Sequence, residues 1–453
     1  MFERNVLSEL SNWAARPTRK PLVLRGARQV GKTSVVSIFS KHFSQYLYLN
    51  FELAEDKKAF EEFTTITNLV QTLFVQKNLQ YSLKEKTLIF IDEIQELPSA
   101  MNLLRYFYEM EPTIPVIAAG SLLETIFNNK IKFPVGRVEY LVVRPVSFSE
   151  FLVAIKELIA VEQLHFVPMN DFAFDKLLQL FSTYALIGGM PEVVNEYAQT
   201  KDITALARIY NSLLISYKDD VEKYADNDAA IQQIRHVINA AFIEAGSRIK
   251  FEGFGDSNYK SREMGETFRT LEKALLLHLV YPNTGVKLPL LPDKKKSPRL
   301  QVLDTGLLNF ASGLQLDILN SKDLNEVHKG LVVEHLVGQE LLAVDFSALH
   351  TLQFWVRDKN TSQAEVDFVY KYNGKLIPIE VKSGATGKLK SLHMYMDKAP
   401  HKMAIRFCAA KINITKIITP VGTAYFLLTM PYFLACKINE YLPWFEEEIK
   451  GMK

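Results

Sequence analysis

Short apolar runs alternate with helical patterns over the first 145 residues of the chain. The runs are Pro21–Arg25, Tyr46–Phe51, Thr87–Ile91 and Pro115–Ala119. They are nearly continuous in apolar residues, as expected for strands that helices cover on both faces. Strands that alternate with helices favour a parallel sheet. We therefore predict an α/β domain over residues 1–146.

The pattern changes in the rest of the chain. Apolar residues at helical spacing, beginning with Phe148 and Phe151, predict a helical lid over residues 147–227. Residues 228–310 show two helices, a strand, a loop rich in Pro and Lys, and a second strand. Residues 320–450 run helix, strands, helix, strand, which indicates a second α/β domain.

The composition narrows the class of protein. The 453 residues carry 53 Lys and Arg against 51 Asp and Glu, and this net charge of +2 excludes a chain that is basic throughout. Cys408 and Cys436 are too few for a disulfide framework and indicate a reducing compartment. The N-terminus lacks the apolar core of a signal peptide, and the apolar stretch Tyr425–Ile438 is too short to cross a membrane. We expect a cytoplasmic protein without membrane contact.

A phosphate-binding loop follows the first predicted strand. Residues 26–33 read Gly-Ala-Arg-Gln-Val-Gly-Lys-Thr and match G-x-x-x-x-G-K-[ST] between a strand and a helix. Such a loop wraps backbone N–H groups around phosphate oxygens at a helix N-terminus. Lys32 is expected to reach the β- and γ-phosphates, and the Thr33 hydroxyl is expected to bind Mg²⁺. The predicted nucleotide contacts are Gly26, Ala27, Arg28, Gln29, Val30, Gly31, Lys32, Thr33 and Ser34.

An apolar strand that ends in two acids supports this site. Leu88–Ile91 is followed by Asp92 and Glu93. Asp92 is placed to hold Mg²⁺ through water, and Glu93 is placed to polarise the attacking water. The alternatives without a nucleotide site are a glycine-containing turn for residues 26–33 and a helix that begins with surface acids for the acidic residues. The second of these explains Glu96 better than it explains Asp92 and Glu93.

Two further residues are candidates for contact with the γ-phosphate. Ser121 follows the strand Pro115–Ala119 at the position of a γ-phosphate sensor. Arg137 fits a sensor or an arginine finger toward a neighbouring subunit of a homo-oligomer, and a surface arginine in a loop explains it equally well.

Residues 17–150 resemble the AAA-type P-loop ATPases. The resemblance rests on Leu-Arg-Gly-Ala-Arg-Gln-Val-Gly-Lys-Thr and Phe-Ile-Asp-Glu-Ile-Gln. One prokaryotic branch also carries Arg-Pro-Val-Ser-Phe-Ser-Glu-Phe, residues 144–151 here, and Gly-Gly-Met-Pro, residues 188–191 here. The resemblance implies that ATP is hydrolysed to ADP and phosphate with Mg²⁺. The C-terminal region of that branch is of unknown function, so the biological task stays undefined.

Residues 228–304 suggest a winged helix. The helices Ile231–Ala245 and Ser261–Lys273 precede two strands that bracket a basic loop. Residues 246–300 hold 11 Lys and Arg against 6 Asp and Glu, a local net charge of +5. A basic helix beside a basic loop is the layout of DNA-binding winged helices, so nucleic acid is one expected partner. A protein-contact or spacer module explains the same pattern.

A β-hairpin is predicted near the C-terminus. Two alternating runs, residues 365–370 and 377–382, flank Asn373-Gly374, the strongest sequence signal for a two-residue hairpin loop. In that register Tyr372 pairs with Lys375.

The same register predicts a cluster of carboxylates. Asp367 falls opposite Glu380 and Glu365 falls opposite Lys382, all on one face. Two opposed carboxylates need a compensating charge, which Mg²⁺ or Mn²⁺ would supply. The alternative is a pair of cross-strand ion pairs without a metal.

The cluster resembles the core of the PD-(D/E)xK nucleases, in which an acid on one strand precedes Glu-x-Lys on the next. The resemblance implies a restriction-endonuclease-like α/β domain, with Asp367 and Glu380 as catalytic metal ligands and Lys382 as a further catalytic residue. The preceding helix offers Glu334 as an additional metal ligand. Val366 stands where the family name has Pro.

Two functions fit these features. The first is ATP hydrolysis, with Lys32 and Glu93 as catalytic residues, coupled to a nucleic-acid-binding or nuclease-like C-terminal domain. The second is an ATP-dependent molecular switch, whose degenerate nuclease-like domain binds a partner protein without cleaving nucleic acid.

Overall fold

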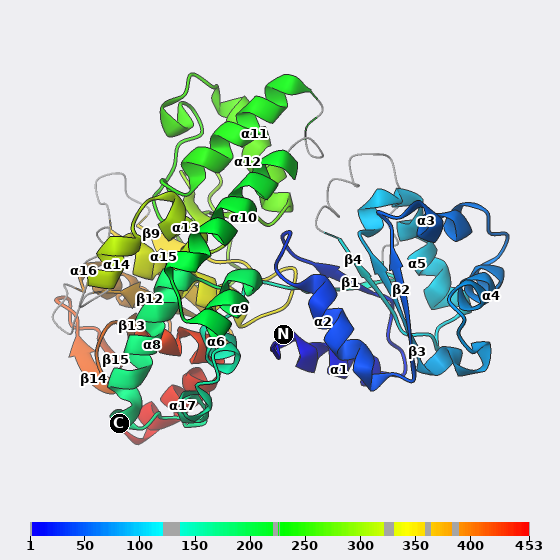
Figure 1. Ribbon diagram of the computed structural model, residues 1–453. Helices are drawn as coiled ribbons and strands as arrows, with labels where there is room; N and C mark the ends of the chain where they lie inside the picture. Colours follow the sequence, from blue (N-terminus) through cyan, green and yellow to red (C-terminus); the bar gives the residue numbers. More distant parts are fainter. Residues whose placement is uncertain are drawn as a thin grey trace. The chain divides into compact units, whose positions relative to one another are not determined.

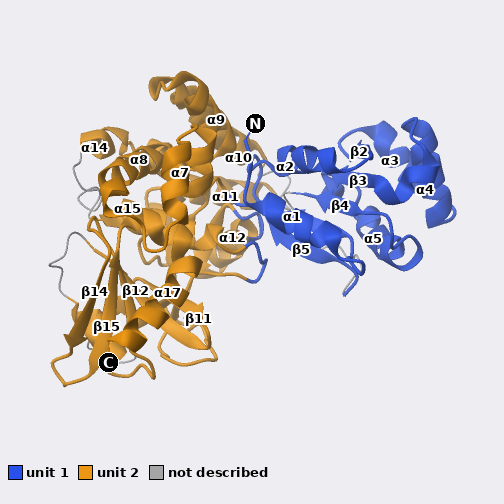
Figure 2. Ribbon diagram, turned by 90° about the horizontal axis from the view of Figure 1, so that it is seen from below, with its two compact units in different colours: residues 1–144, 273–275, 346–349 blue, residues 145–272, 276–345, 350–453 orange. Residues whose placement is uncertain are grey.

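The structure of the chain is a computed structural model, shown as a ribbon in Figure 1. It divides into two compact units, which Figure 2 colours separately. The first unit comprises residues 1–144, 273–275 and 346–349, and the second comprises residues 145–272, 276–345 and 350–453. The structure describes residues 2–120, 136–220, 225, 227–320, 330–357, 364–382 and 389–452.

The described part of the first unit is built on a five-stranded sheet with the order β2-β3-β4-β1-β5. Every pairing in it is parallel, which confirms the predicted α/β fold. All six residues of β3 are buried, as expected for a strand between two layers of helices. The strands are β1 (Leu22–Arg25), β2 (Gln45–Asn50), β3 (Thr87–Asp92), β4 (Val116–Ala119) and β5 (Glu139–Val142).

Helices lie on both sides of this sheet in Figure 1, with α1 and α2 on one side and α3, α4 and α5 on the other. Leu69 and Leu73 of α4 and Leu104 of α5 belong to one buried apolar cluster with the strand residues Leu47 and Ile89. The helices are α1 (Val6–Ala15), α2 (Lys32–Phe39), α3 (Ala54–Glu61), α4 (Ile66–Gln76) and α5 (Pro98–Met110).

The second unit opens with the helices that the sequence predicts after residue 146. Helix α6 begins at a capping box, in which the Ser147 hydroxyl accepts a hydrogen bond from the Glu150 N–H and the Glu150 carboxylate accepts one from the Ser147 N–H. The helices are α6 (Phe148–Ala154), α7 (Leu158–His165), α8 (Phe174–Ile187), α9 (Pro191–Thr200) and α10 (Ala207–Asp219).

The Gly-Gly-Met-Pro turn between α8 and α9 has a structural explanation. A Cβ on Gly189 would lie 2.2 Å from the Val146 carbonyl oxygen, and a Cβ on Gly188 would lie 2.4 Å from Asp304 Oδ1. Gly189 N donates to Asp304 Oδ2 at 2.6 Å, and Val146 N donates to Gly189 O at 2.7 Å. The two motifs that the sequence shows around residues 144–151 and 188–191 therefore pack against each other, and only glycine fits the contact.

Residues 228–320 contain the elements that suggested a winged helix. Helices α11 and α12 precede an antiparallel pair, β6 and β8, in which Val280 lies opposite Arg299. The family of this segment stays a prediction. Its elements are α11 (Asp228–Ala241), α12 (Ser261–Lys273), β6 (Leu277–Val280), β8 (Arg299–Val302), α13 (Thr305–Ala311) and α14 (Gln315–Asn320).

The C-terminal part of the second unit is also α/β. A five-stranded sheet has the order β11-β12-β13-β15-β14, with parallel pairs in the centre and antiparallel pairs at both edges, and a small sheet has the order β10-β9-β7. The strands are β7 (Pro282–Asn283), β9 (Phe354–Val356), β10 (Glu365–Val366), β11 (Phe368–Tyr372), β12 (Lys375–Val381), β13 (Met403–Phe407), β14 (Asn413–Ile418) and β15 (Ala424–Met430). The helices are α15 (Leu331–Ala343), α16 (Lys390–Met396) and α17 (Ile438–Gly451).

The predicted hairpin is present, with one correction. Tyr372 pairs with Lys375 as predicted, and Asn373 and Gly374 both have positive φ. Counted outward from the turn, the ladder ends at the pair of Phe368 with Ile379, and the chain bends at Asp367, so the predicted pairing of Asp367 with Glu380 is not part of the ladder.

The bend moves Glu365 to another sheet. The predicted pairing of Glu365 with Lys382 is wrong, because Glu365 pairs with Val356 of β9. The Asp367 side chain gives a physical reason, since its Oδ2 accepts a hydrogen bond from the Val381 N–H at 2.7 Å and so takes a donor that a continued ladder would use.

Within the described residues, no helix is long and apolar enough to cross a membrane. Cys408 and Cys436 are both free thiols.

Candidate functional site

The phosphate-binding loop lies between the end of β1 and the start of α2. Gly31 caps α2 with φ 93°, and Gln29 has φ 65°. A Cβ on Gly26 would lie 2.5 Å from the Val143 carbonyl oxygen, so a side chain does not fit there. The loop is thus at the carboxyl edge of a parallel sheet, where open α/β folds bind ligands.

Lys32 is folded back onto this loop. Its Nζ donates to the carbonyl oxygens of Gly26 at 3.0 Å and Ala27 at 2.9 Å. Burial lowers the pKa of Lys32 to about 8, although the carboxylates of Glu93 and Asp92 oppose this shift. An anion such as a phosphate would offer this buried ammonium a stronger partner than two neutral carbonyls.

Thr33 and Asp92 meet across the loop. The Thr33 hydroxyl donates to Asp92 Oδ2 at 2.6 Å, and Asp92 Oδ1 accepts from the Glu93 N–H at 3.1 Å. Burial raises the pKa of Asp92, and the hydrogen bond from Thr33 offsets this increase only in part. A hydroxyl and a carboxylate side by side are the oxygen ligands that Mg²⁺ prefers, so these residues fit the ion that a P-loop nucleotide brings.

Glu93 directly follows β3 with a left-handed backbone, φ 49° and ψ 44°. This conformation is uncommon for a residue other than glycine and tends to occur at functional sites. The Glu93 carboxylate accepts a short hydrogen bond from the Gln95 side chain. The structure thus brings Lys32, Thr33, Asp92 and Glu93 together, as the sequence predicts.

Two predicted γ-phosphate contacts remain untested. Ser121 lies outside the described residues. Arg137 forms an ion pair with Glu109 at 2.9 Å, and the same carboxylate oxygen also binds Arg105.

Arg4 is a residue of this site that the sequence did not reveal. Its buried guanidinium donates to the carbonyl oxygens of Val30, at 3.2 Å, and Arg144, at 2.7 Å. Arg4 therefore links the phosphate-binding loop, through Val30, to the backbone at Arg144 and stabilises the loop. A single arginine far from the motif carries no pattern that could have identified it.

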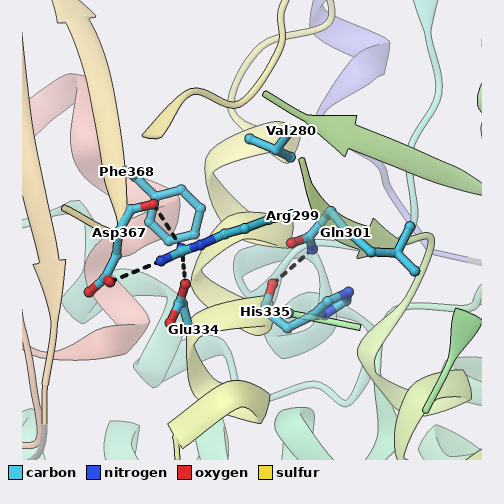
Figure 3. Close-up of a pocket in the computed structure, with 9 residues that line it drawn as sticks. Val280, Arg299, Gln301, Glu334, His335, Asp367 and Phe368 are labelled. Atoms are coloured by element: carbon cyan, nitrogen blue, oxygen red, sulfur yellow. Dashed lines mark hydrogen bonds and ion pairs between the residues drawn. The ribbon is translucent and has the colours of Figure 1, made fainter. Parts of the chain in front are cut away.

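A second cluster of charged residues lies in the C-terminal part of the chain (Figure 3). The Arg299 guanidinium points between Glu334 and Asp367. It forms short ion pairs with Glu334 and Glu365, and it lies 3.4 Å from Asp367 Oδ1. Arg248 lies 3.6 Å from Glu365 Oε2.

Glu380 and Lys382 extend this cluster. Lys382 Nζ lies 2.8 Å from Glu380 Oε1 and 3.9 Å from Asp367 Oδ2. Burial raises the pKa of Glu380, and Asp367 raises it further. Burial lowers the pKa of Lys382, but the carboxylates of Asp367 and Glu380 outweigh this effect and raise it.

The structure therefore brings the predicted residues Asp367, Glu380, Lys382 and Glu334 into one network, but with an unexpected cation. As the described residues are arranged, with Arg299 between the carboxylates, no group of three or more His, Cys, Asp or Glu side chains is placed to hold a metal ion. The sequence places Arg299 among the cations of the predicted DNA-binding segment. In the structure the Arg299 guanidinium instead faces carboxylates of its own unit.

Comparisons with known proteins identify the first domain. Residues 18–152 match the family described as an AAA domain. Residues 178–317 and 329–425 match two families described as domains of unknown function, DUF8612 and DUF4143. No curated protein matches the chain.

Two solved structures are similar to parts of the chain. One is a Walker-type ATPase of Pyrococcus abyssi, with 13% identity and a TM-score of 0.44, over 69% of this chain and 96% of that chain. The other is Drosophila ORC bound to DNA, with 15% identity and a TM-score of 0.24, over 65% of this chain and 90% of that chain. Both TM-scores are too low to support an argument about function. The family match and the loop geometry together show that residues 18–152 form an AAA-type P-loop ATPase domain.

Proposed function

We propose that this protein binds ATP with Mg²⁺ and hydrolyses it to ADP and phosphate. The observation that carries the proposal is the contact between Thr33 and Asp92 beside Lys32 and Glu93, at the carboxyl edge of the first sheet. Each of these groups has a role in phosphoryl transfer that its chemistry suits.

The roles follow from the contacts. The Lys32 ammonium leaves the Gly26 and Ala27 carbonyls and binds phosphate oxygens instead. Thr33 and Asp92 would hold Mg²⁺, which would neutralise charge on the phosphates. Glu93 orients a water molecule for attack and accepts its proton.

Replacing Lys32 by alanine is expected to weaken the binding of ATP with Mg²⁺ by roughly 10- to 100-fold, because charge-assisted hydrogen bonds to the phosphates are lost. Isothermal titration of the full chain with a non-hydrolysable ATP analogue measures this change. Lys41→Ala is the matched control, since Lys41 is exposed just after the same helix. Equal binding by Lys32→Ala and Lys41→Ala would contradict the proposal.

We also propose that residues 228–310 and 320–450 form a winged-helix-like and a nuclease-like module that binds a partner protein, in a manner that depends on the nucleotide, without cutting nucleic acid. The ion pairs that Arg299 forms with Glu334, Glu365 and Asp367, and that Arg248 forms with Glu365, support this choice over a nuclease. Carboxylates engaged by guanidinium groups are poorly placed to ligate the metal that cleavage needs.

A nuclease assay decides between the two readings of this module. Wild-type protein with Mg²⁺ or Mn²⁺, with and without ATP, is expected to cleave labelled DNA and RNA no faster than Asp367→Ala. Cleavage by the wild type that disappears in Asp367→Ala would establish the nuclease instead.

A further inference from the structure

We infer that the guanidinium of Arg299 takes the place of a divalent cation in the carboxylate cluster, and that this cluster binds Mn²⁺ or Mg²⁺ only once Arg299 is removed. The inference deepens the proposal of a non-cleaving C-terminal module and rests on it. It is independent of ATP hydrolysis by the first unit.

The contacts of Arg299 are those that a bound cation would make. Its guanidinium touches three carboxylates from different parts of the chain: Glu334 on α15, Glu365 on β10 and Asp367 at the bend. It also donates to the Asp367 carbonyl oxygen at 3.2 Å. All of these partners are hard oxygen ligands of the kind that Mg²⁺ and Mn²⁺ select.

Arg299 is held in this position by the backbone. Arg299 is the first residue of β8, where its backbone pairs with Val280 of β6 and forms an isolated β-bridge with Arg248. Its guanidinium carbon lies 4.8 Å from the centroid of the Phe354 ring, whose face favours a cation. The positive charge is therefore a constant part of the fold.

The charges of the cluster support the same conclusion. Its ion pairs join four carboxylates, those of Glu334, Glu365, Asp367 and Glu380, to the cations of Arg299, Arg248 and Lys382. The formal net charge is −1. Without Arg299 it becomes −2, which one divalent cation neutralises.

Glu380 supplies an independent sign of an incomplete ligand set. Its side chain is 3% exposed, and its Oε2 accepts no hydrogen bond from any residue that the structure describes. A buried carboxylate oxygen without a donor is costly unless a cation or a proton satisfies it.

The test is a Mn²⁺ titration of the full chain, with the electron paramagnetic resonance signal of free Mn²⁺ as the readout. All proteins carry Asp92→Asn, which removes the carboxylate ligand of the nucleotide site. We expect no Mn²⁺ binding by the chain with Arg299 over the titrated range and one bound Mn²⁺ per chain in Arg299→Met, a gain in affinity of roughly tenfold or more over the weakest binding that the titration detects. Adding Glu334→Gln to Arg299→Met is expected to reverse the gain.

Arg248→Met is the matched control, because it removes a more exposed cation whose ion pair in the cluster is with Glu365, and it leaves Arg299 in place. It is expected to bind no Mn²⁺. A folded Arg299→Met chain that binds no Mn²⁺ overturns the inference but leaves the proposal of a non-cleaving module standing. Nucleic-acid cleavage by the wild type would overturn both.

Mn²⁺ binding by the chain that keeps Arg299 tests the inference even if Arg299→Met does not fold. Mn²⁺ binding by the chain with Arg299 that is lost in Glu334→Gln would show that the guanidinium does not exclude the metal, and would overturn the inference. Recovery of folded Arg299→Met on addition of Mn²⁺ would support it, because a ligand stabilises the state that binds it.

Discussion

Replacing Glu93 by glutamine is expected to remove most ATP hydrolysis while ATP binding stays close to that of the wild type. A general base contributes roughly 10²- to 10⁴-fold to a rate, and glutamine cannot accept the proton of the attacking water. The hydrogen bonds that hold the nucleotide are expected to remain, because the described hydrogen bonds of Glu93 are to Asp92 and Gln95 and its carboxylate acts on Lys32 through charge.

Steady-state phosphate release and equilibrium binding of the ATP analogue together test this expectation. Glu96→Gln is the matched control, since it makes the same change three residues further along the chain, and its rate is expected to stay within about twofold of the wild type. A Glu93→Gln variant that hydrolyses ATP at the wild-type rate would remove Glu93 from the proposed mechanism.

The buried carboxyl of Glu340 is expected to make the second unit less stable as pH rises from about 4.5 to about 8. Glu340 is fully buried on α15, a helix whose surface is buried on almost every side. Burial raises its pKa from an ordinary value of 4.5 to about 8, although hydrogen bonds from Tyr184 and the Phe148 N–H oppose the shift.

A proton on Glu340 lets both contacts of the Tyr184 hydroxyl be hydrogen bonds at the same time. The Tyr184 hydroxyl lies 2.6 Å from the Val146 carbonyl oxygen and 2.7 Å from Glu340 Oε1. A hydroxyl carries one hydrogen, and a carbonyl can only accept. When the Tyr184 hydroxyl donates to Val146, the second contact needs a protonated Glu340 that donates to the Tyr184 oxygen.

The direction of the pH dependence follows from the raised pKa. Below about pH 4.5 both the folded and the unfolded chain carry the proton, and Glu340 has no effect on the pH dependence. Between about pH 4.5 and 8 the unfolded chain has lost it and the folded chain keeps it, so unfolding releases a proton and stability falls with rising pH. Above about pH 8 both forms are ionised and the loss is complete.

Glu340→Gln isolates this effect. Its amide can donate to Tyr184 and accept from the Phe148 N–H but cannot ionise. We expect the stability of Glu340→Gln relative to wild type to increase by about 3–4 kcal/mol between pH 5 and pH 8. Comparison of two proteins at each pH cancels the contributions of other buried groups such as His335, whose pKa burial lowers to about 3.

Urea unfolding at several pH values measures the difference. With Trp13 of the first unit replaced by phenylalanine, tryptophan fluorescence reports on Trp355 and Trp444 of the second unit. Glu448→Gln, at an exposed position, is the matched control and is expected to show a difference below about 0.5 kcal/mol. A constant difference between wild type and Glu340→Gln across this range would show that Glu340 is ionised in the folded chain.

The nucleotide site was predictable because its parts are local in the sequence. The loop of residues 26–33 is a contiguous motif, and Asp92 and Glu93 end an apolar strand. The parallel sheet joins the two pieces, because the carboxyl ends of its strands share an edge. Arg4 was not predictable, since it supports the loop through backbone carbonyls and such a contact leaves no pattern in the sequence.

The carboxylate cluster was predictable only in part. The Asn373-Gly374 turn determined the hairpin register, and the acids that the nuclease resemblance singled out do meet in one network. The register failed at Asp367, where a side chain competes with the backbone for a donor. Whether a side chain does so depends on neighbours that the local alternation does not reveal.

The sequence by itself thus determined the P-loop, the strand and helix pattern of the first domain and the hairpin turn, because each depends on residues that are close together along the chain. Only the tertiary structure decided what neutralises the acids of the C-terminal part. Arg299 meets Glu334, Glu365 and Asp367 across 35 to 68 positions of sequence, and the pairing of β8 with β6 sets its place. Such a contact depends on how separate elements pack, which no local pattern of residues encodes.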